Sequence, residues 1–250
     1  MELTNLSSEL ALAIKAAEAS GKLLQKQKKQ FNEILSSNSK DIKLKADTQS
    51  EGLIKEIITT QSSYPILSEE SGKSSKNLGD IFWVIDPLDG TANYNRDIPF
   101  CCVSIGLVNN MEPILGVVYD FNNKHMYVGD TINNLSKMNK SHINVSNKSD
   151  KAESILITGL PHGTDYSTKS LEDMIVDMQE WQKIRMMGSA ALAACYVASG
   201  KAERYQENGT YLWDIIAGAA IVKSSGGLVE ITNQRDNFQV DVVFSNSKIK

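Results

Sequence analysis

The sequence predicts a mixed fold of helices packed on sheets, α+β in its first part and α/β in its second. Two observations predict this class. The first part has two amphipathic helical stretches followed by short apolar runs that Asn-containing turns separate, a pattern typical of an antiparallel meander. The second part alternates strand-like and helix-like runs, which is typical of helices that pack on a sheet.

The first part opens with an amphipathic helix, because Leu10, Ile14, Ala17, Gly21 and Leu24 recur at spacings of three and four residues. A second helix is expected over about residues 47–62, with its isoleucines on the buried side. The strands expected here are residues 65–67, 81–85, 102–108, 113–120 and 124–128.

Residues 131–149 are rich in Asn, Ser and Lys and predict a boundary between two lobes, residues 1–135 and 136–250. The first lobe would hold the antiparallel sheet and most candidate ligands, and the second lobe the substrate pocket. The elements expected in the second lobe are strand 154–158, helix 169–181, strand 183–186, helix 189–199, strand 202–206 and helix 214–225.

The composition is that of an ordinary globular protein, with 41% hydrophobic and 22% charged residues. The net charge of −4 gives no basic excess, so we expect no nucleic-acid partner. We see neither a signal peptide nor an apolar run long enough to span a bilayer, so no membrane association is expected. Cys101, Cys102 and Cys195 give an odd count without metal-ligand spacing, which favours a reducing, cytoplasmic location.

Two acids directly follow the apolar run 81–85. Asp86 ends that run, Asp89 comes three residues later, and Gly90 and Thr91 follow at once. In sheets combined with helices, ligands tend to bind beyond the carboxyl ends of strands. Glycine lets a backbone approach a ligand closely, and backbone N–H groups at a helix start attract anions. This segment therefore predicts a site for a phosphate and its counter-ions.

Other acids repeat the pattern. Glu69 and Glu70 follow the preceding strand, Asp47 opens the second helix, and Asp214 opens a later one. Each has a simpler interpretation alone: a capped turn for the Asp86–Asp89 segment, a solvated pair for Glu69 and Glu70, a helix N-cap for Asp214. Their joint occurrence favours one cluster that divalent cations neutralise, and oxygen-only ligands favour Mg²⁺ or Mn²⁺ over Zn²⁺.

These residues lie in four motifs that resemble those of the inositol monophosphatase family of metal-dependent, lithium-sensitive phosphatases. The resemblance covers nearly the whole chain and implies the layered αβαβα sandwich of the inositol monophosphatase and fructose-1,6-bisphosphatase superfamily, often as a homodimer. The motifs are residues 68–71 (SEES), 83–94 (WVIDPLDGTANY), 188–192 (GSAAL) and 213–218 (WDIIAG).

The resemblance implies two or three Mg²⁺ ions, with Mn²⁺ as a possible substitute. Glu69, Asp86 and the Leu88 carbonyl would hold the first ion, and Asp86, Asp89 and Asp214 the second. A weaker third ion would lie near Glu69. The catalytic group would be Thr91, Asp47 and Glu69, with Thr91 hydrogen-bonded towards Asp47 to orient the attacking water.

The resemblance also implies the substrate contacts. The ligand would be a small phosphorylated metabolite, bound by Asp89, Gly90, Thr91, Gly188, Ser189, Ala190, Glu207 and Asp214. Two positions depart from the family pattern. Leu44 stands where members usually carry Thr, which concerns the third ion, and Lys40 is the candidate for a lysine often found upstream.

The leading functional hypothesis is hydrolysis of inositol 1-phosphate or another polyol phosphate. The alternatives are a 3′(2′),5′-bisphosphate nucleotidase, a fructose-1,6-bisphosphatase or a histidinol-phosphatase, whose metal motifs are the same. Arg185 and Arg204 are candidate contacts for a second phosphate. A further alternative of another class is a regulatory partner that keeps the fold, as some bacterial relatives are linked to transcription or ribosome biogenesis.

Overall fold

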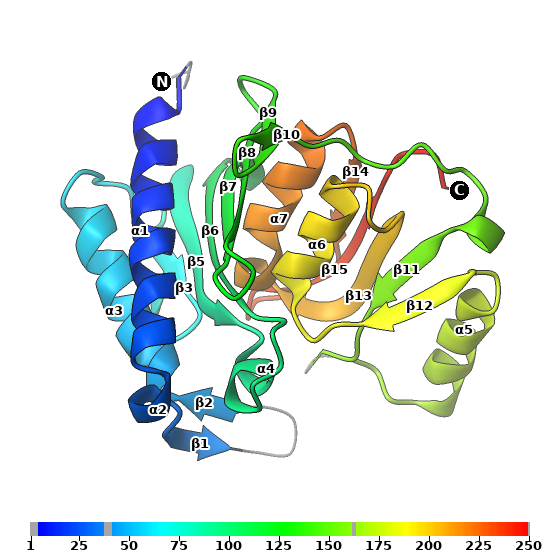
Figure 1. The fold of residues 1–250 in the computed structure, drawn as a ribbon, viewed down its shortest axis with the longest axis horizontal. Helices are drawn as coiled ribbons and strands as arrows, with labels where there is room; N and C mark the ends of the chain where they lie inside the picture. The colour runs from blue at the N-terminus through cyan, green and yellow to red at the C-terminus, as the bar shows by residue number, and fades with distance from the viewer. Residues whose placement is uncertain (1–4, 38–41, 162–163, 250) are drawn as a thin grey trace.

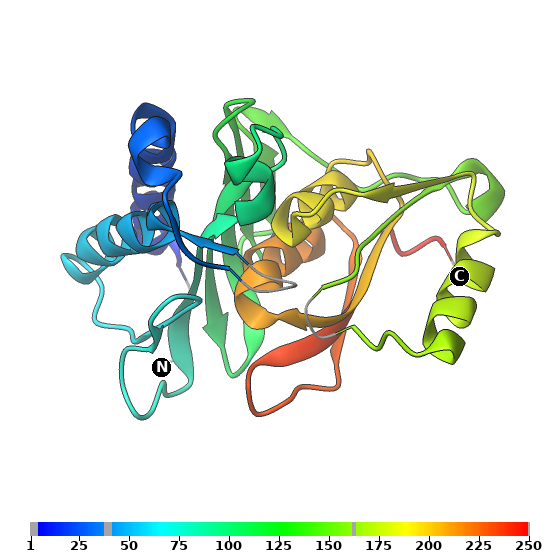
Figure 2. The same ribbon diagram turned by 90° about the horizontal axis from the view of Figure 1, so that it is seen from below.

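Helices and sheets alternate in five layers across the molecule (Figure 1). In this computed structural model, residues 5–37, 42–161 and 164–249 are described. The first layer holds α1 (Ser7–Lys26) and α3 (Lys45–Thr59), and the outermost layer at the other end holds α5 (Thr168–Met178). Between the two sheets lie α6 (Ala190–Ala198) and α7 (Leu212–Ser224), as Figure 2 also shows. The expected αβαβα sandwich is confirmed.

The first sheet has eight strands in the order β10-β9-β8-β7-β6-β5-β3-β4. The meander from β5 to β10 is antiparallel throughout, and β3 pairs with β5 in parallel. Its strands are β3 (Ile66–Ser68), β4 (Gly72–Lys73), β5 (Ile81–Asp89), β6 (Cys102–Asn109), β7 (Glu112–Asp120), β8 (His125–Asp130), β9 (Leu135–Met138) and β10 (Ser141–His142).

The segment expected to separate two lobes contributes β9 and β10 to this first sheet. The sheet therefore continues to His142, beyond residue 135. One hydrophobic cluster joins residues of the first sheet to α6, α7 and the second sheet. The division into lobes at residues 135 and 136 stays a prediction.

The second sheet has five strands in the order β12-β11-β13-β15-β14. β11 lies between two parallel partners, and β15 runs antiparallel to both of its neighbours. The strand expected over residues 202–206 continues to Tyr211 as β13, and β14 and β15 were not predicted. The strands are β11 (Ile155–Thr158), β12 (Lys183–Met186), β13 (Arg204–Tyr211), β14 (Leu228–Thr232) and β15 (Gln239–Ser245).

A row of glycines explains how α7 packs on the first sheet. Gly106, Gly116 and Gly129 are direct cross-strand partners in β6, β7 and β8. A Cβ atom at Gly116 would lie 2.0 Å from the carbonyl oxygen of Ala217, and one at Gly129 2.5 Å from the Cα atom of Ile221. Contacts this short leave no room for a side chain, so the row forms a groove in which the α7 backbone lies.

Smaller elements complete the chain. These are α2 (Lys28–Phe31), the hairpin of β1 (Ile34–Ser37) and β2 (Ile42–Leu44), α4 (Thr91–Asn95) and a 3₁₀ turn (Lys151–Glu153). In the described ranges, no helix has the length and apolar character needed to span a bilayer.

Candidate active site

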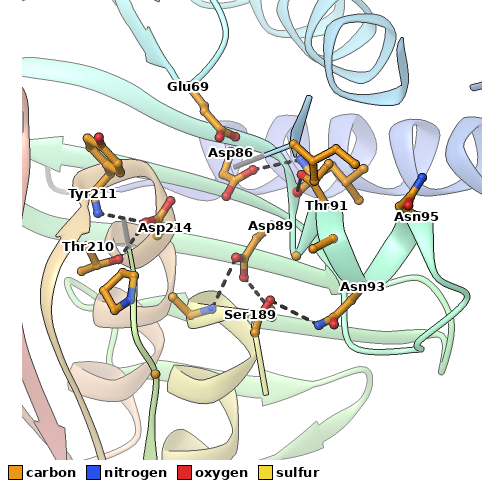
Figure 3. A pocket seen from close by; sticks show the side chains of 18 of the residues that line it. Glu69, Asp86, Asp89, Thr91, Asn93, Asn95, Ser189, Thr210, Tyr211 and Asp214 are labelled. Carbon is orange, nitrogen blue, oxygen red and sulfur yellow. Dashed lines mark hydrogen bonds between the residues drawn. The ribbon is translucent and has the colours of Figure 1, made fainter. Parts of the chain in front are cut away.

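The predicted site residues gather around one pocket of about 800 Å³ (Figure 3). The pocket lies where β3 and β5 end and where α4, α6 and α7 begin. Asp47 does not line it but reaches it through Thr91. The predicted residues that line the pocket are Glu69, Asp86, Leu88, Asp89, Gly90, Thr91, Gly188, Ser189, Ala190, Glu207 and Asp214.

A bulge at the end of β5 aims two acids into the pocket. Asp86 pairs with Ser104 and Asp89 with Cys102, so residues 87 and 88 of β5 lie opposite the single residue 103 of β6. In a regular strand Asp86 and Asp89, three positions apart, would face opposite sides of the sheet; the bulge puts both on the face towards α6 and α7. The Leu88 N–H donates to Asp86 Oδ1 at 2.9 Å, which fixes the loop.

Gly90 closes the segment with a backbone conformation that few other residues adopt. Its φ is +90°, and a Cβ there would lie 2.6 Å from the Phe100 carbonyl oxygen and 3.1 Å from that of Gly188. Both the left-handed conformation and the contact require glycine. The chain can then enter α4 with Thr91 facing the pocket.

The start of α6, a helix between the two sheets, holds Asp89 of the first sheet. Ser189 Oγ donates to Asp89 Oδ2 at 2.5 Å (Figure 3). The Ala191 N–H donates to the same oxygen at 2.8 Å, and the Ala190 N–H to Oδ1 at 3.3 Å. Cys102 Sγ lies 3.6 Å from the same Oδ2. A carboxylate at a helix N-terminus is also favoured by the helix dipole. Asp89 thus connects the strand that carries it to the 188–190 loop.

Thr91 and Asp47 form the predicted hydrogen-bonded pair. Thr91 Oγ1 lies 3.0 Å from Asp47 Oδ1 and 3.0 Å from the Leu88 carbonyl oxygen. Asp47 Oδ2 accepts from the Leu44 N–H at 2.5 Å, which fixes the carboxylate at the first turn of α3. Burial raises the pKa of Asp47 to about 7, although the bonds from Leu44 and Thr91 act in the opposite direction.

The acids at the ends of β3 and β5 repel each other. Burial raises the pKa of Asp86 well above its ordinary value, and the charges of Glu69, Asp89 and Asp214 raise it further. Burial likewise raises the pKa of Glu69, with Asp214 as the next cause. Such a concentration of buried carboxylates is stable when cations neutralise it.

Asp214 occupies the first turn of α7. Its Oδ2 accepts from the Tyr211 N–H at 2.9 Å and from Thr210 Oγ1 at 2.7 Å (Figure 3). This arrangement parallels that of Asp47, because each acid accepts the backbone N–H that precedes its helix. The helix-cap and metal-site interpretations of Asp214 are therefore compatible, since both use the same carboxylate.

Glu207 lies in the middle of β13 and faces the pocket. Burial raises its pKa to about 8, and Asp214 and Asp89 add repulsion. Gly159, at the end of β11, leaves space for it, because a Cβ there would lie 2.3 Å from Glu207 Oε1. β11 and β13 are parallel neighbours, so their carboxyl ends bring these residues together.

The donor set fits a hard divalent cation. Five carboxylates line the pocket together with Leu88, and four of them, Glu69, Asp86, Asp89 and Asp214, are the predicted ligands. Carboxylate and carbonyl oxygens are the ligands that Mg²⁺ prefers. Within the described ranges, no three His, Cys, Asp or Glu side chains already stand in a metal-binding arrangement. Asp89 would have to reorient to bind an ion, because Ser189, Ala190 and Ala191 already donate to its two oxygens. For Asp214, the bonds from Thr210 and Tyr211 both go to Oδ2, so they fix the carboxylate by one oxygen.

Leu44, which departs from the family pattern, has a structural explanation. Leu44 is completely buried in the core beside α1 and α3 and contributes its backbone N–H rather than a hydroxyl to Asp47. Lys43 Nζ lies 3.1 Å from a carboxylate oxygen of Glu70. Lys40 lies outside the described residues. Arg185 and Arg204 do not line the pocket, whereas Arg96 does.

Two residues that support the site, Asn93 and Thr210, were not among the predicted site residues. Asn93 Nδ2 lies 2.7 Å from the Phe100 carbonyl oxygen and 2.8 Å from that of Met187, so it ties α4 to the loop before α6. Thr210 holds Asp214. Asn93 stands inside the 83–94 motif, which could have indicated it. Thr210 has no sequence signal of its own.

Comparison with known proteins identifies the family. The model of the inositol monophosphatase family matches residues 5–250. The chain is 37% identical over 226 residues to a Nus factor SuhB of Pasteurella multocida, covering 88% of this chain and 84% of the relative. It is 35% identical over 194 residues to an inositol-1-monophosphatase of Synechocystis, covering 76% and 66%.

Solved structures agree with these matches. The inositol monophosphatase of Anabaena superposes with a TM-score of 0.83 at 32% identity, covering 97% of this chain and 92% of that one. The family model's match over residues 5–250 includes both sheets and every element that borders the pocket. The chain belongs to the inositol monophosphatase family.

Proposed function

We propose that the protein is a Mg²⁺-dependent phosphomonoester hydrolase whose substrate is inositol 1-phosphate or a related polyol phosphate. The observation that carries this proposal is the convergence of Glu69, Asp86, Asp89 and Asp214 on one pocket, beside the Thr91–Asp47 pair. Bound Mg²⁺ would activate water, orient the phosphate and offset charge on the leaving oxygen. Mn²⁺ would substitute, as both ions prefer oxygen ligands.

Each residue would bind an ion or the phosphate according to its position in the pocket. Glu69, Asp86 and the Leu88 carbonyl would hold one ion, and Asp86, Asp89 and Asp214 a second. A weaker third ion would lie near Glu69. The Gly90 backbone and the Thr91 hydroxyl would contact the phosphate, because glycine allows close approach there.

Thr91, Asp47 and Glu69 would orient the attacking water and help to deprotonate it. The Thr91 hydroxyl is within hydrogen-bond distance of Asp47 Oδ1, so it can receive a proton from water as it passes its own towards the carboxylate. Asp47 stays oriented meanwhile because its other oxygen accepts the Leu44 N–H. In-line attack on phosphorus by this water forms no covalent phosphoenzyme.

The polyol would lie on the α6 and β13 side of the pocket. Gly188, Ser189 and Ala190 would contact it there, and Glu207 and Asp214 would accept its hydroxyls. A polyol offers several hydroxyl donors, which matches a wall of carboxylates better than an apolar metabolite would.

A substrate panel tests this proposal. Purified protein with Mg²⁺ should release phosphate from inositol 1-phosphate, chelation of Mg²⁺ should stop the release, and Li⁺ should inhibit it. The panel should include fructose 1,6-bisphosphate, 3′-phosphoadenosine 5′-phosphate and histidinol phosphate. If the protein hydrolyses one of these compounds faster, that compound would replace the polyol phosphate as the proposed substrate. Arg96, the basic residue among the described residues that line the pocket, would then be the candidate contact for the substrate.

A second candidate function comes from the relatives named Nus factor SuhB, which include the Pasteurella protein. A partner-binding role would not need the pocket's chemistry. Asp89→Asn separates the two functions, because it removes a proposed metal ligand while an amide can still accept the bonds of α6. Loss of phosphate release together with loss of cellular function favours catalysis; retained cellular function favours the partner role.

We also propose that the chain forms a homodimer through the outer face of the second sheet. β12 is an edge strand, and the neighbouring α5 has no buried residue. Ile175, Val176 and Met186 expose 52%, 61% and 54% of their surface here. Exposed apolar groups beside a strand edge are typical of an interface. Light scattering should give a dimer mass, Val176→Glu should give a monomer, and Lys169→Glu on the same helix should not.

A further inference from the structure

The second break in strand register in the pocket lies in β13. Asn208 pairs with Asp241 and Thr210 with Val240, so Gly209 is an extra residue on the β13 side. Gly209 has a φ of +81°, the left-handed conformation that a bulge of this kind requires. Bulges next to active sites commonly redirect a side chain.

The bulge determines which way Thr210 points. Val240 and Val242 are buried in the core between the sheets, and they pair with Thr210 and Glu207 respectively. Thr210 therefore shares the inward face with Glu207, although the two residues lie three positions apart along the chain, an odd offset that places them on opposite faces of a regular strand. In a regular strand Thr210 would share the outward face with Asn208, which is exposed.

The inward orientation brings Thr210 to Asp214. The Thr210 side chain is 1% exposed, and its Oγ1 donates to Asp214 Oδ2 at 2.7 Å. The Tyr211 N–H donates to the same oxygen at 2.9 Å. Two donors on one oxygen define the plane of the carboxylate, which a single donor does not.

A polar cluster outside the pocket stabilises the bulge. Asp241 Oδ1 accepts from the Gly209 N–H at 2.8 Å, a donor that the break in register leaves without a ladder partner. Arg235 and Asn233 donate to the Asp241 carboxylate at 3.0 and 2.7 Å and orient it in turn. A chain of contacts thus runs from Asp241 through Gly209 and Thr210 to Asp214.

We propose that Thr210 is a positioning residue for Asp214, and that the Gly209 bulge, held by Asp241, is the device that presents it. The inference rests on the proposed function, in which Asp214 is a Mg²⁺ ligand. Partners that orient a metal-binding carboxylate commonly change metal affinity by about ten- to a hundredfold. Thr210 would touch neither the ion nor the substrate.

Calorimetric titration with MgCl₂ tests this inference without relying on turnover. Thr210→Val keeps the shape of the side chain and removes the hydroxyl, so we expect its dissociation constant for Mg²⁺ to rise about tenfold. Thr210→Ser restores the hydroxyl and should bind Mg²⁺ within about threefold of the parent. In assays, the Mg²⁺ concentration for half-maximal rate should rise in Thr210→Val, while kcat at saturating Mg²⁺ changes little.

Each outcome is decisive. Equal Mg²⁺ affinity in Thr210→Val and the parent would overturn the inference alone, and so would a Thr210→Ser variant as weak as Thr210→Val. A parent that binds no Mg²⁺ would overturn the proposed function as well. If Thr210→Val does not fold, Asp241→Ala decides: it should weaken Mg²⁺ binding, whereas Asp236→Ala in the same hairpin should not, and equal affinities would overturn the inference.

Discussion

The ends of β5 and β13 face each other across the pocket, and each breaks register by one extra residue. In β5 the break presents Asp86 and Asp89 directly. In β13 it presents Thr210, which holds an acid of the following helix. The same kind of bulge therefore has two roles. In β5 it directs two proposed ligands into the pocket, and in β13 it directs a residue that positions a third ligand, Asp214. Changes at the β5 end should affect chemistry most, and changes at the β13 end should affect affinity and stability.

The largest effect in this comparison is expected at Thr91, directly after the β5 bulge. Thr91→Val keeps the side-chain shape and removes the hydroxyl that contacts Asp47. Because this hydroxyl orients the attacking water in the proposed mechanism, kcat should fall about a hundredfold. Steady-state phosphate release measures it. Thr59→Val, whose exposed hydroxyl bonds only within α3, is the control and should keep parental activity.

The two glycines at the bulges give the next effect. Gly90→Ala combines a left-handed backbone with a contact of 2.6 Å to a carbonyl oxygen, so it should lower the free energy of unfolding by about 3 kcal/mol. Gly209→Ala, at a φ of +81°, should cost about 1 kcal/mol from the backbone conformation. Denaturant unfolding measures both. A Gly209→Ala variant less stable than Gly90→Ala would reverse the proposed ranking of the two bulges.

The effect that depends on pH concerns Glu207, an acid in the middle of β13. Unlike Asp214, it does not stand in the first turn of a helix. Its pKa is raised from an ordinary 4.5 to about 8 by burial, so the folded protein binds this proton more tightly than the unfolded chain. The stability from this group is complete below about pH 4.5 and is lost as the pH rises through about 8.

Glu207→Gln stays neutral and escapes that loss. In metal-free protein, its melting temperature should exceed the parental value at pH 9 by about 10 °C more than at pH 5. Differential scanning calorimetry at the two pH values measures this difference. An equal difference in melting temperature between Glu207→Gln and the parent at both pH values would contradict the proposed burial of the Glu207 charge.

Much of the fold followed from local sequence patterns. The helical periodicity around Leu10 and the alternation through 102–128 predicted α1 and the meander, because one buried face determines each pattern. β14 and β15 were missed although 228–232 alternates in burial, since the glycines and asparagines around them resemble loop sequence. β9 and β10 were missed because they are short and mostly polar, at the edge that β10 forms and directly beside it.

The site residues likewise fall into those that local sequence patterns predicted and those that they did not. Asp86, Asp89, Glu69 and Asp214 could be proposed as a group because each follows a strand or opens a helix. Thr210 could not, because its direction depends on the register of β13 against β15, which no local pattern encodes. Asn93 likewise acts through carbonyl groups of Phe100 and Met187, which only the tertiary fold brings near.

The proposed metal-dependent chemistry depends most directly on Asp86, the acid that would bridge two ions. Phosphate release from inositol 1-phosphate should be measured against Mg²⁺ concentration for the parent and Asp86→Asn, with calorimetry of Mg²⁺ binding alongside. The parent should show saturable dependence on Mg²⁺ and no release with chelator, and Asp86→Asn should lose Mg²⁺ binding and at least about a thousandfold in rate. Release that persists with chelator, or in Asp86→Asn at the parental rate, would contradict it.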